Sequence, residues 1–474
     1  MTAQSTVGDN HFSARRARFL AKLPAGSVAI FVSNPEQTRS NDTEFPYRQS
    51  SDVLYLSAFP EPESLLILTN IAGEKSFQML VRAKDRQQEI WTGIRCGVEG
   101  ARTEYGAEAA YTVDEFKQVV AKLLGKAQQV YYTFGRNEHF DKLFTPLWTA
   151  NQKTLANPEP LLHEMRLFKA PEEVALMRIA GEISADGHCQ AMRQCQPGVS
   201  EYELQAVLEG TFRARGADAP AYGSIVAGGN NAIVLHYVEN HDALADGDLV
   251  LIDAACEYQG YAADITRTFP VNGKFSEAQR EIYELVLKAQ VAAIASARAG
   301  VPLVKVHETA QRVLRTGLVK LGILPKGARV KKAKQGGKAA KGSTPALSLA
   351  DFFMHGTSHW IGLDVHDVGS YSSDSADTNR RGARTRLLEP GMAITVEPGL
   401  YFDKDDKRVA RKYRGIGVRI EDDVVITADG NEVLTAGVPK TVADIEALMA
   451  RDTAPVGADE EEGDISIGER FRGR

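Results

Sequence analysis

The most informative stretch of the sequence is residues 249–269, which read LVLIDAACEYQGYAADITRTF. Two apolar, β-rich arms flank the turn-like segment EYQG, a pattern that predicts a β-hairpin. With the hairpin centred between Tyr258 and Gln259, Asp253 and Asp264 are expected to be cross-strand partners on one face, with Cβ atoms about 5 Å apart.

Two carboxylates placed this closely in an apolar sheet repel each other, and their removal from water adds to the cost. Either one of them takes up a proton or a cation lies between them. The alternative is an exposed hairpin face on which water solvates both charges. The pair alone therefore leaves a metal site and a solvated surface both open.

Three later segments contain the further ligands that a cation would need. Residues 355–369 (HGTSHWIGLDVHDVG) hold three histidines, and Glu397 ends an apolar strand-like run within residues 394–401 (ITVEPGLY). In residues 417–427 (GVRIEDDVVIT), Arg419 and Glu421 are two positions apart, so on a strand they share a face. A single Glu or His near the end of a strand is usually a surface residue or a hydrogen-bonded core residue. Together with the paired aspartates, however, the three segments favour a metal site.

The chain is predicted to contain two domains. Residues 1–165 alternate strand-like and amphipathic segments, which indicates an α/β domain. The expected strands are 27–32, 53–57, 65–69 and 130–134, and 113–124 is an amphipathic stretch. Residues 171–450 mix long helices with hairpins, which indicates an α+β domain.

Helix signals are clear in the second domain. Pro171, followed by two glutamates, begins a helix that should end near Gln194. Ser276 and Gln279 form a capping box ahead of the apolar helix face Ile282, Leu285, Val286, Ala289 and Ala293. A further helix over 304–321 should end at Gly322.

Two segments are predicted to be additions to this framework. Residues 325–345 form a basic insertion, in which 326–341 carry seven Lys and Arg among Gly and Ala. We expect a flexible solvated loop, because charge runs are usually solvated. Residues 453–474 are acidic and poor in apolar side chains, which indicates a disordered tail.

Composition excludes several classes of protein. The 474 residues carry a net charge of −6, which gives no indication of a nucleic-acid binder. Four cysteines show neither CxxC spacing nor a disulfide framework, which favours a reducing compartment. The first twenty residues lack the apolar core of a signal peptide, and no apolar run is long enough to span a membrane. We therefore expect a cytoplasmic protein.

Several motifs along the chain identify a family. In order they are LHY (235–237), the spaced pair Asp253 and Asp264, HGTSHWIGLDVHD (355–367), VEPGLY (396–401) and RGIGVRIEDD (414–423). They resemble the motifs of Xaa-Pro aminopeptidases, the proline-specific members of the pita-bread metallopeptidase family M24. The resemblance runs over nearly all of residues 13–450 and includes DTEFPYRQSSDVLYLSAFPEPE (42–63).

The resemblance implies an α/β N-terminal domain, a pita-bread catalytic domain and two divalent metal ions. Carried over by motif, the metal ligands are Asp253, Asp264, His359, Glu397 and Glu421, with Asp264 and Glu421 bridging the ions. Both the family and this hard, oxygen-rich set favour Mn²⁺.

The expected reaction is hydrolysis of the peptide bond before a proline at the second position. Two cations about 3.5–4 Å apart activate a bridging water as a hydroxide that attacks the carbonyl. Glu397 is expected to move the proton of that water to the leaving nitrogen.

Further residues are implied by the same resemblance. His366 and His236 should bind the carbonyl oxygen and the transition state, and His355 and His366 should shape the pocket on the proline side. Arg419 should contact Tyr401 and Asp42. The alternative for Asp42, that its side chain caps a loop before Pro46, is also open. Trp91 should line the peptide channel, either that of its own chain or that of a neighbouring subunit. The alternative is that Trp91 packs in the core.

Two other functions share some of these features. A prolidase, which cleaves only dipeptides that end in proline, uses the same ligands. A non-catalytic pita-bread module that binds peptides typically lacks some of the ligands, whereas all five are present here. The family also implies a homodimer or homotetramer.

Overall fold

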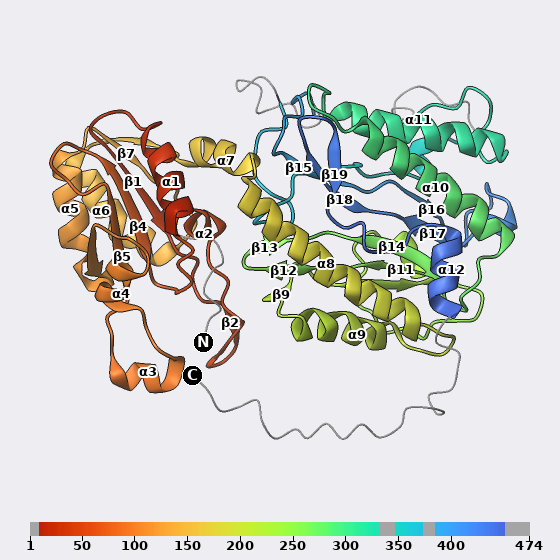
Figure 1. The fold of residues 1–474 in the computed structure, drawn as a ribbon, viewed down its shortest axis with the longest axis horizontal. Coiled ribbons are helices and arrows are strands. Elements are labelled where there is room, and N and C mark those ends of the chain that lie inside the picture. Colours follow the sequence, from red (N-terminus) through yellow and green to blue (C-terminus); the bar gives the residue numbers. More distant parts are fainter. Residues whose placement is uncertain (1–8, 331–346, 373–383, 451–474) are drawn as a thin grey trace, which may run out of the picture.

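The computed structural model describes residues 9–330, 347–372 and 384–450. The chain forms two sheet-containing parts that are joined by α7 (Glu159–Leu167) (Figure 1). The first part is an α/β domain and the second an α+β domain, so the predicted fold class is confirmed.

The N-terminal part is built on one six-stranded mixed sheet in the order β6-β5-β4-β1-β7-β8. Its strands are β1 (Ser27–Val32), β4 (Leu65–Asn70), β5 (Phe77–Val81), β6 (Ala109–Thr112), β7 (Gln129–Tyr131) and β8 (Thr154–Ala156). The helices α5 (Phe116–Lys126) and α6 (Glu138–Asn151) pack on one face. The other face packs against α1 (Asp9–Leu20), α2 (Ser51–Ser57) and α7. A small hairpin of β2 (Thr38–Ser40) and β3 (Thr43–Glu44), together with α3 (Arg86–Thr92) and α4 (Gly97–Thr103), completes this part.

Two of the four strands predicted for this part need correction. Residues 53–57 belong to the helix α2, because a short apolar run fits a helix as well as a strand and Val53, Tyr55 and Leu56 are all buried by it. The helix ends at Ala58, whose φ of 56° is left-handed. The strand predicted at 130–134 is shorter and ends at Tyr131.

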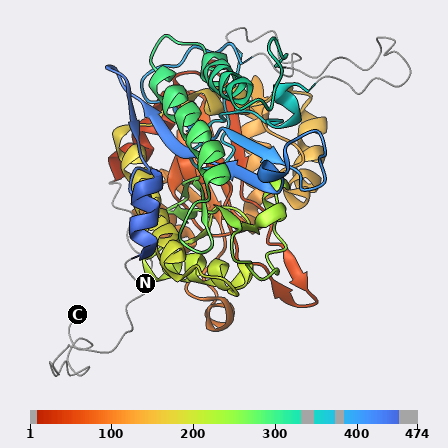
Figure 2. The ribbon, with the colours of Figure 1, turned by 90° about the vertical axis from the view of Figure 1, so that its right-hand side faces the viewer.

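The C-terminal part places short strands between two pairs of helices. The helices α8 (Pro171–Gln194) and α9 (Glu201–Ala214) cover one face, and α10 (Glu277–Ser296) and α11 (Val304–Lys320) cover the other (Figures 1 and 2). One sheet contains β10 (Ile225–Gly228), β11 (Leu249–Asp253) and β14 (Thr266–Pro270), and a second contains β9 (Ala219–Pro220), β12 (Cys256–Tyr258) and β13 (Tyr261–Ala262). The later strands form a three-stranded sheet in the order β15 (Ala393–Val396), β18 (Asp422–Ile426), β19 (Asn431–Val433), and a two-stranded sheet of β16 (Gly399–Phe402) with β17 (Ile416–Arg419). The helix α12 (Val442–Ala450) ends the described chain.

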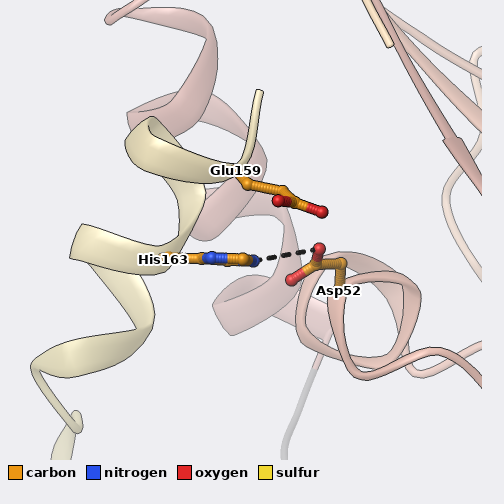
Figure 3. A group of neighbouring side chains, drawn as sticks. All are labelled: Asp52, Glu159 and His163. Atoms are coloured by element: carbon orange, nitrogen blue, oxygen red, sulfur yellow. Dashed lines mark hydrogen bonds and ion pairs between the residues drawn. The ribbon is translucent and has the colours of Figure 1, made fainter. Parts of the chain in front are cut away.

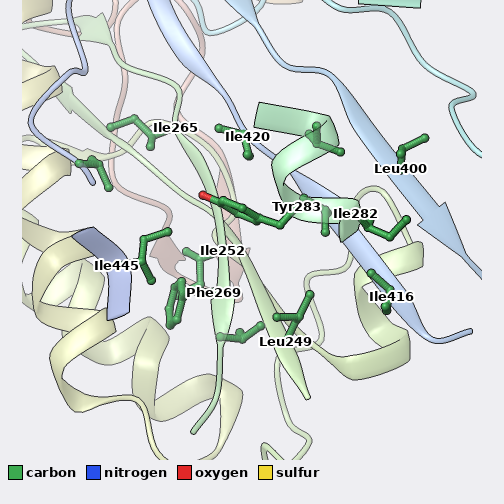
Figure 4. Close-up of a cluster of buried hydrophobic side chains, with 14 of the residues drawn as sticks. Leu249, Ile252, Ile265, Phe269, Ile282, Tyr283, Leu400, Ile416, Ile420 and Ile445 are labelled. Carbon is green, nitrogen blue, oxygen red and sulfur yellow. The ribbon is translucent and has the colours of Figure 1, made fainter. Parts of the chain in front are cut away.

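A continuous apolar core supports these strands from behind. Figure 4 shows side chains of β11 and β14 meeting those of α10, β16, β17 and α12. The labelled residues are Leu249, Ile252, Ile265, Phe269, Ile282, Tyr283, Leu400, Ile416, Ile420 and Ile445. This packing fixes the strands, and so fixes the polar groups at their ends.

The helix predictions for this part are confirmed. The helix α8 runs from Pro171 to Gln194, and α10 begins with the Ser276–Gln279 capping box. The predicted apolar face of α10 is buried throughout. The helix α11 ends at Lys320, and Gly322 follows with a φ of 72°.

The predicted register of the central hairpin is wrong by two residues. Tyr258 pairs with Tyr261, so the turn is formed by Gln259 and Gly260, and Asp253 pairs with Thr266. Both turn residues have positive φ, 48° and 82°, as the two central positions of a tight hairpin turn require. Because a slip of two positions keeps every side chain on its face, the two aspartates still point to the same side.

Two predictions lie partly or wholly outside the described residues. These are the loop of the basic insertion, of which 331–346 are not described, and the acidic tail at 453–474. Among the helices that are described, none combines the length and the hydrophobicity needed to cross a bilayer.

Candidate metal centre

The polar side chains predicted for the site converge on one cavity of the C-terminal part. The cavity has a volume of about 210 Å³. Its lining contains nine of the predicted site residues and one residue that was not predicted, Leu235. The nine are His236, Asp253, Asp264, His355, His359, His366, Glu397, Arg419 and Glu421.

All four carboxylates of the cavity come from strand ends or from breaks between strands. Asp253 ends β11, and Asp264 lies between β13 and β14. Glu397 lies between β15 and β16, and Glu421 lies between β17 and β18. Glu421 therefore does not share a strand with Arg419 as predicted, since β17 ends at Arg419. At these breaks the backbone leaves the hydrogen-bonded β-ladder, so the four side chains can face the same cavity.

Three of these groups lie close enough to share a metal ion. One ligand atom each from Asp264, His359 and Glu421 lies within 4.8 Å of the others. Nε2 of His359 is 3.5 Å from Oδ2 of Asp264 and 3.9 Å from Oε1 of Glu397. Asp253 and Glu397 line the same cavity, so five ligands are available.

The electrostatics of the cavity disfavour a buried negative charge without a counter-charge. Burial and the charge of Asp253 raise the pKa of Asp264 to about 6, against the opposing effect of His359. Burial and the charges of Asp264, Glu397 and Asp253 raise the pKa of Glu421 well above its usual value. Divalent cations would relieve this repulsion, so the donor set fits a metal centre.

His359 is oriented as a metal-binding histidine would be. Its Nδ1–H donates to the carbonyl oxygen of Trp360 at 3.0 Å. In the neutral ring this leaves the lone pair of Nε2 facing the carboxylates. Without a metal ion, the same Nε2 can carry a proton toward Asp264: burial would lower the pKa of His359, but the hydrogen bond to Asp264 and the charge of that carboxylate raise it.

Glu397 is held beside a second histidine. Its Oε2 is 3.4 Å from Nδ1 of His355. Burial would raise the pKa of Glu397, but the hydrogen bond and charge of His355 outweigh this and lower it. Glu397 is therefore a carboxylate near neutral pH and can accept a proton.

Arg419 is buried and fully engaged. Its guanidinium donates to Asp253 at 2.6 Å, to Tyr401 at 3.2 Å and to Thr266 at 3.1 Å. The Tyr401 hydroxyl is also 2.8 Å from Nε2 of His355. The predicted contact with Tyr401 is thus confirmed.

The predicted contact between Arg419 and Asp42 is wrong for a single chain. Asp42 is exposed in the turn between β2 and β3, where its side chain accepts a hydrogen bond from the neighbouring Asn41. Across the described ranges, these two side chains form neither an ion pair nor a hydrogen bond. The reason is that Asp253 already neutralises Arg419 from within the same part.

Trp91 is neither in the core nor in the cavity of its own chain. It lies on α3 and is 84% exposed, so the core-packing alternative is wrong. Its neighbours Ile90 and Ile94 are 75% and 89% exposed.

Three groups that support the site were not predicted. The hydroxyl of Tyr222 lies 2.7 Å from both Asp253 and Asp264. Thr266 donates to Glu421 at 2.6 Å. Buried Glu201 accepts hydrogen bonds from Gly228, Asn231, Tyr237 and Asp242, and so fixes the loop that carries His236. Only Thr266 could have been found from sequence, as the true cross-strand partner of Asp253.

Comparison with known proteins gives consistent matches over most of the chain. The pattern of metallopeptidase family M24 matches residues 175–428, and that of the aminopeptidase P N-terminal domain matches residues 12–132. The Xaa-Pro aminopeptidase of Escherichia coli K12 is 44% identical over 460 residues, 94% of this chain and 98% of that protein. Xaa-Pro aminopeptidase 3 of Homo sapiens is 36% identical over 434 residues, 90% of this chain and 81% of that protein.

Solved structures give the same result. Aminopeptidase PepP of Pseudomonas aeruginosa superposes with a TM-score of 0.86 at 43% identity, covering 95% of this chain and 99% of that one. Proline aminopeptidase P II of Yersinia pestis superposes with a TM-score of 0.85 at 45% identity, covering 94% and 100%.

Proposed function

The chain belongs to metallopeptidase family M24 and carries the N-terminal domain of aminopeptidase P, and we infer from this that its cavity removes the first residue from peptides whose second residue is proline. The activity is that of an Xaa-Pro aminopeptidase, a dinuclear metallopeptidase with a pita-bread catalytic domain. The observation that carries the inference is the convergence of four carboxylates and His359 on one cavity.

We propose that Asp253, Asp264, His359, Glu397 and Glu421 hold two divalent ions, with Asp264 and Glu421 shared between them. The proximity of these groups and the raised pKa values of Asp264 and Glu421 support this assignment. When bound, the ions supply a water of lowered pKa and stabilise negative charge on the substrate carbonyl.

The proposed metal is Mn²⁺, since four carboxylates and one imidazole form a hard donor set. Metal-free protein reconstituted separately with Mn²⁺, Co²⁺ and Zn²⁺ tests this choice. The highest turnover with an ion other than Mn²⁺ would refute it.

The proposed proton carrier is Glu397. It accepts the proton of the attacking water and delivers it to the proline nitrogen, which leaves as an amine only after protonation. His355 holds the carboxylate in place through its 3.4 Å contact.

The remaining residues of the cavity are proposed to bind the substrate. Burial lowers the pKa of His366, so its ring is neutral near pH 7 and donates one N–H to the scissile carbonyl, together with His236. His355 and His366 border the proline side. Arg419 and Tyr401 hold Asp253 and His355 in their orientations. A contact between Asp42 and the substrate remains a prediction.

The assay that tests the function compares two peptides. Arg-Pro-Pro is expected to lose its first residue, and the dipeptide Gly-Pro is expected to be cleaved far more slowly. Cleavage of the dipeptide alone would instead indicate a prolidase. Absence of turnover and of bound metal would indicate a non-catalytic peptide-binding module.

We also propose that the chain forms a homodimer or homotetramer through α3, with Trp91 reaching the peptide channel of a neighbouring subunit. The support is the row of exposed apolar side chains at Ile90, Trp91 and Ile94, because such a patch on a monomer usually marks an interface. Four unpaired cysteines support a cytoplasmic location.

Trp91→Glu is expected to lower both the molecular mass in solution and the turnover of the tripeptide, because a charge opposes burial of the patch. Light scattering measures the mass. The matched control is Tyr202→Glu, at an aromatic residue of α9 that is 56% exposed. An unchanged mass for Trp91→Glu, or an equal loss in the control, would contradict the assembly.

A further inference from the structure

An ionic network joins the N-terminal part to the loop that carries His366. Arg166, near the end of α7, donates to Asp52 of α2 at 2.7 Å, to Asp364 at 2.8 Å and to Asp367 at 2.6 Å. Lys169 donates to the other oxygen of Asp367 at 2.9 Å. Arg166 and Lys169 are almost fully buried, so water screens these contacts little.

One side of this network has the composition of a metal site but not its charge balance. Asp52, Glu159 and His163 face one another between α2 and α7 (Figure 3). Asp52 already binds Arg166, and Glu159 already binds Arg136. Two guanidinium groups neutralise the two carboxylates, so a cation would gain no unpaired negative charge. The cluster is a contact between α2 and α7.

The loop at residues 363–367 is held largely by groups that precede the catalytic domain. Arg48 donates to the carbonyl oxygen of Leu363 at 2.6 Å. Ser51 donates to Asp364 at 2.6 Å, and Arg166 binds the aspartates on both sides of His366. Arg48, Ser51, Arg166 and Lys169 all come from the N-terminal domain or from the α7 segment that follows it.

His366 itself has little else to fix it. In the part of the chain that the structure describes, its ring forms no hydrogen bond and contacts His359 edge-on, with ring centroids 4.3 Å apart. Its position therefore depends on the backbone of residues 363–367, and so on the charges that hold that backbone.

We propose that Arg166 is a positioning residue that places His366 for the substrate carbonyl by clamping Asp364 and Asp367 to the N-terminal domain. This inference rests on the proposed role of His366. It gives the N-terminal domain a part in the chemistry of a cavity that is built entirely from the C-terminal part.

A double-mutant cycle between Arg166→Lys and His366→Ala tests the proposal in the full-length, metal-loaded protein. Lysine keeps the charge but cannot reach three carboxylates. Arg166→Lys is expected to lower kcat by about 10–100-fold with little change in KM, because small displacements of a catalytic group are costly. In the His366→Ala background the same change should cost no more than about twofold, since the residue it positions is gone.

The matched control is Arg15→Lys. Arg15 is as buried as Arg166, 3% exposed, and it links Glu173 to the backbone of Tyr55 at the same junction without touching the loop. Its substitution should leave kcat within about twofold. Should Arg166→Lys fail to fold, Asp364→Asn replaces it, because that side chain is 39% exposed.

Hydrogen exchange gives a readout that does not depend on activity. Amides of residues 361–367 should exchange faster in Arg166→Lys than in the wild type or in Arg15→Lys. Additive losses in the cycle, unchanged exchange, or an equal loss in Arg15→Lys would overturn the proposal. If His366→Ala alone costs nothing, the role proposed for His366 fails, and the positioning role of Arg166 fails with it.

Discussion

Glu397→Gln is expected to lower kcat for an Xaa-Pro tripeptide by about 10³–10⁴-fold, with a much smaller change in KM. Glutamine keeps the shape of the side chain and one oxygen that can face a metal ion. It cannot carry a proton from the attacking water to the proline nitrogen. Steady-state kinetics measures the loss, and metal analysis of the same sample shows whether the ions are retained.

Glu173→Gln is the matched control for that experiment. Glu173 is a buried glutamate of α8 that accepts a hydrogen bond from Tyr261 at 2.8 Å and pairs with Arg15, and it is not part of the cavity lining. It should lose stability but keep kcat. A Glu397→Gln protein that retains more than about a tenth of kcat with full metal content would rule out Glu397 as the proton carrier.

Local signals in the sequence predicted the framework of the molecule well. The proline and glutamates at the start of α8, and the capping box of α10, act within one turn of helix and need no knowledge of the rest of the chain. Residues 53–57 show the limit of such signals. Their apolar run fits a strand or a helix, and only packing against the sheet and the C-terminal part selects the helix.

The hairpin illustrates how a wrong register can leave a correct site. The turn at Gln259 and Gly260 requires two positive φ values, and a glycine at the second central position is the usual signal for it. Centring the hairpin between Gln259 and that glycine would have paired Asp253 with Thr266. Both registers put the aspartates on one face, so the prediction of a shared site survived the error.

The groups that orient the ligands could not be predicted in the same way. Tyr222, Glu201 and Arg166 act through single contacts between segments that lie far apart in the sequence. Their residue types carry no periodicity and no spacing that ties them to the cavity. Such contacts become visible only when the packed elements are placed.

Removal of the metal ions with a chelator is expected to abolish turnover and to leave buried carboxyls that contribute less to stability at about pH 7.5 than at about pH 5.5. The folded pKa of Asp264 is about 6 against an ordinary value of 3.8, and that of Glu421 is also raised. In this window these two carboxyls therefore bind more protons in the metal-free folded state than in the unfolded chain, so their contribution to stability falls as pH rises. The raised pKa of His359 acts in the same direction, because its stabilising contribution is present at low pH and is lost as pH rises through the folded value.

The lowered pKa of Glu397 does not oppose this trend, because its contribution is lost only as pH falls below its ordinary value of 4.5. Three histidines do oppose it: burial lowers the pKa of His188 and His307 to about 4 and also lowers that of His366, so their contribution to stability rises with pH over the same window. The contribution of Asp264 is the difference in the free energy of unfolding between the metal-free wild type and metal-free Asp264→Asn. This difference should change by on the order of 1 kcal/mol between the two pH values, measured by urea titration. Bound cations should reverse the trend, since metal binding expels the protons and grows stronger as pH rises. Between about pH 5.5 and about pH 7.5, the stability of metal-free Asp264→Asn should fall less, or rise more, than that of the metal-free wild type, because a carboxyl of raised pKa has been removed. If Asp264→Asn left the pH dependence of the metal-free protein unchanged, the carboxylates would not be confined together, and the metal centre would lose its physical basis.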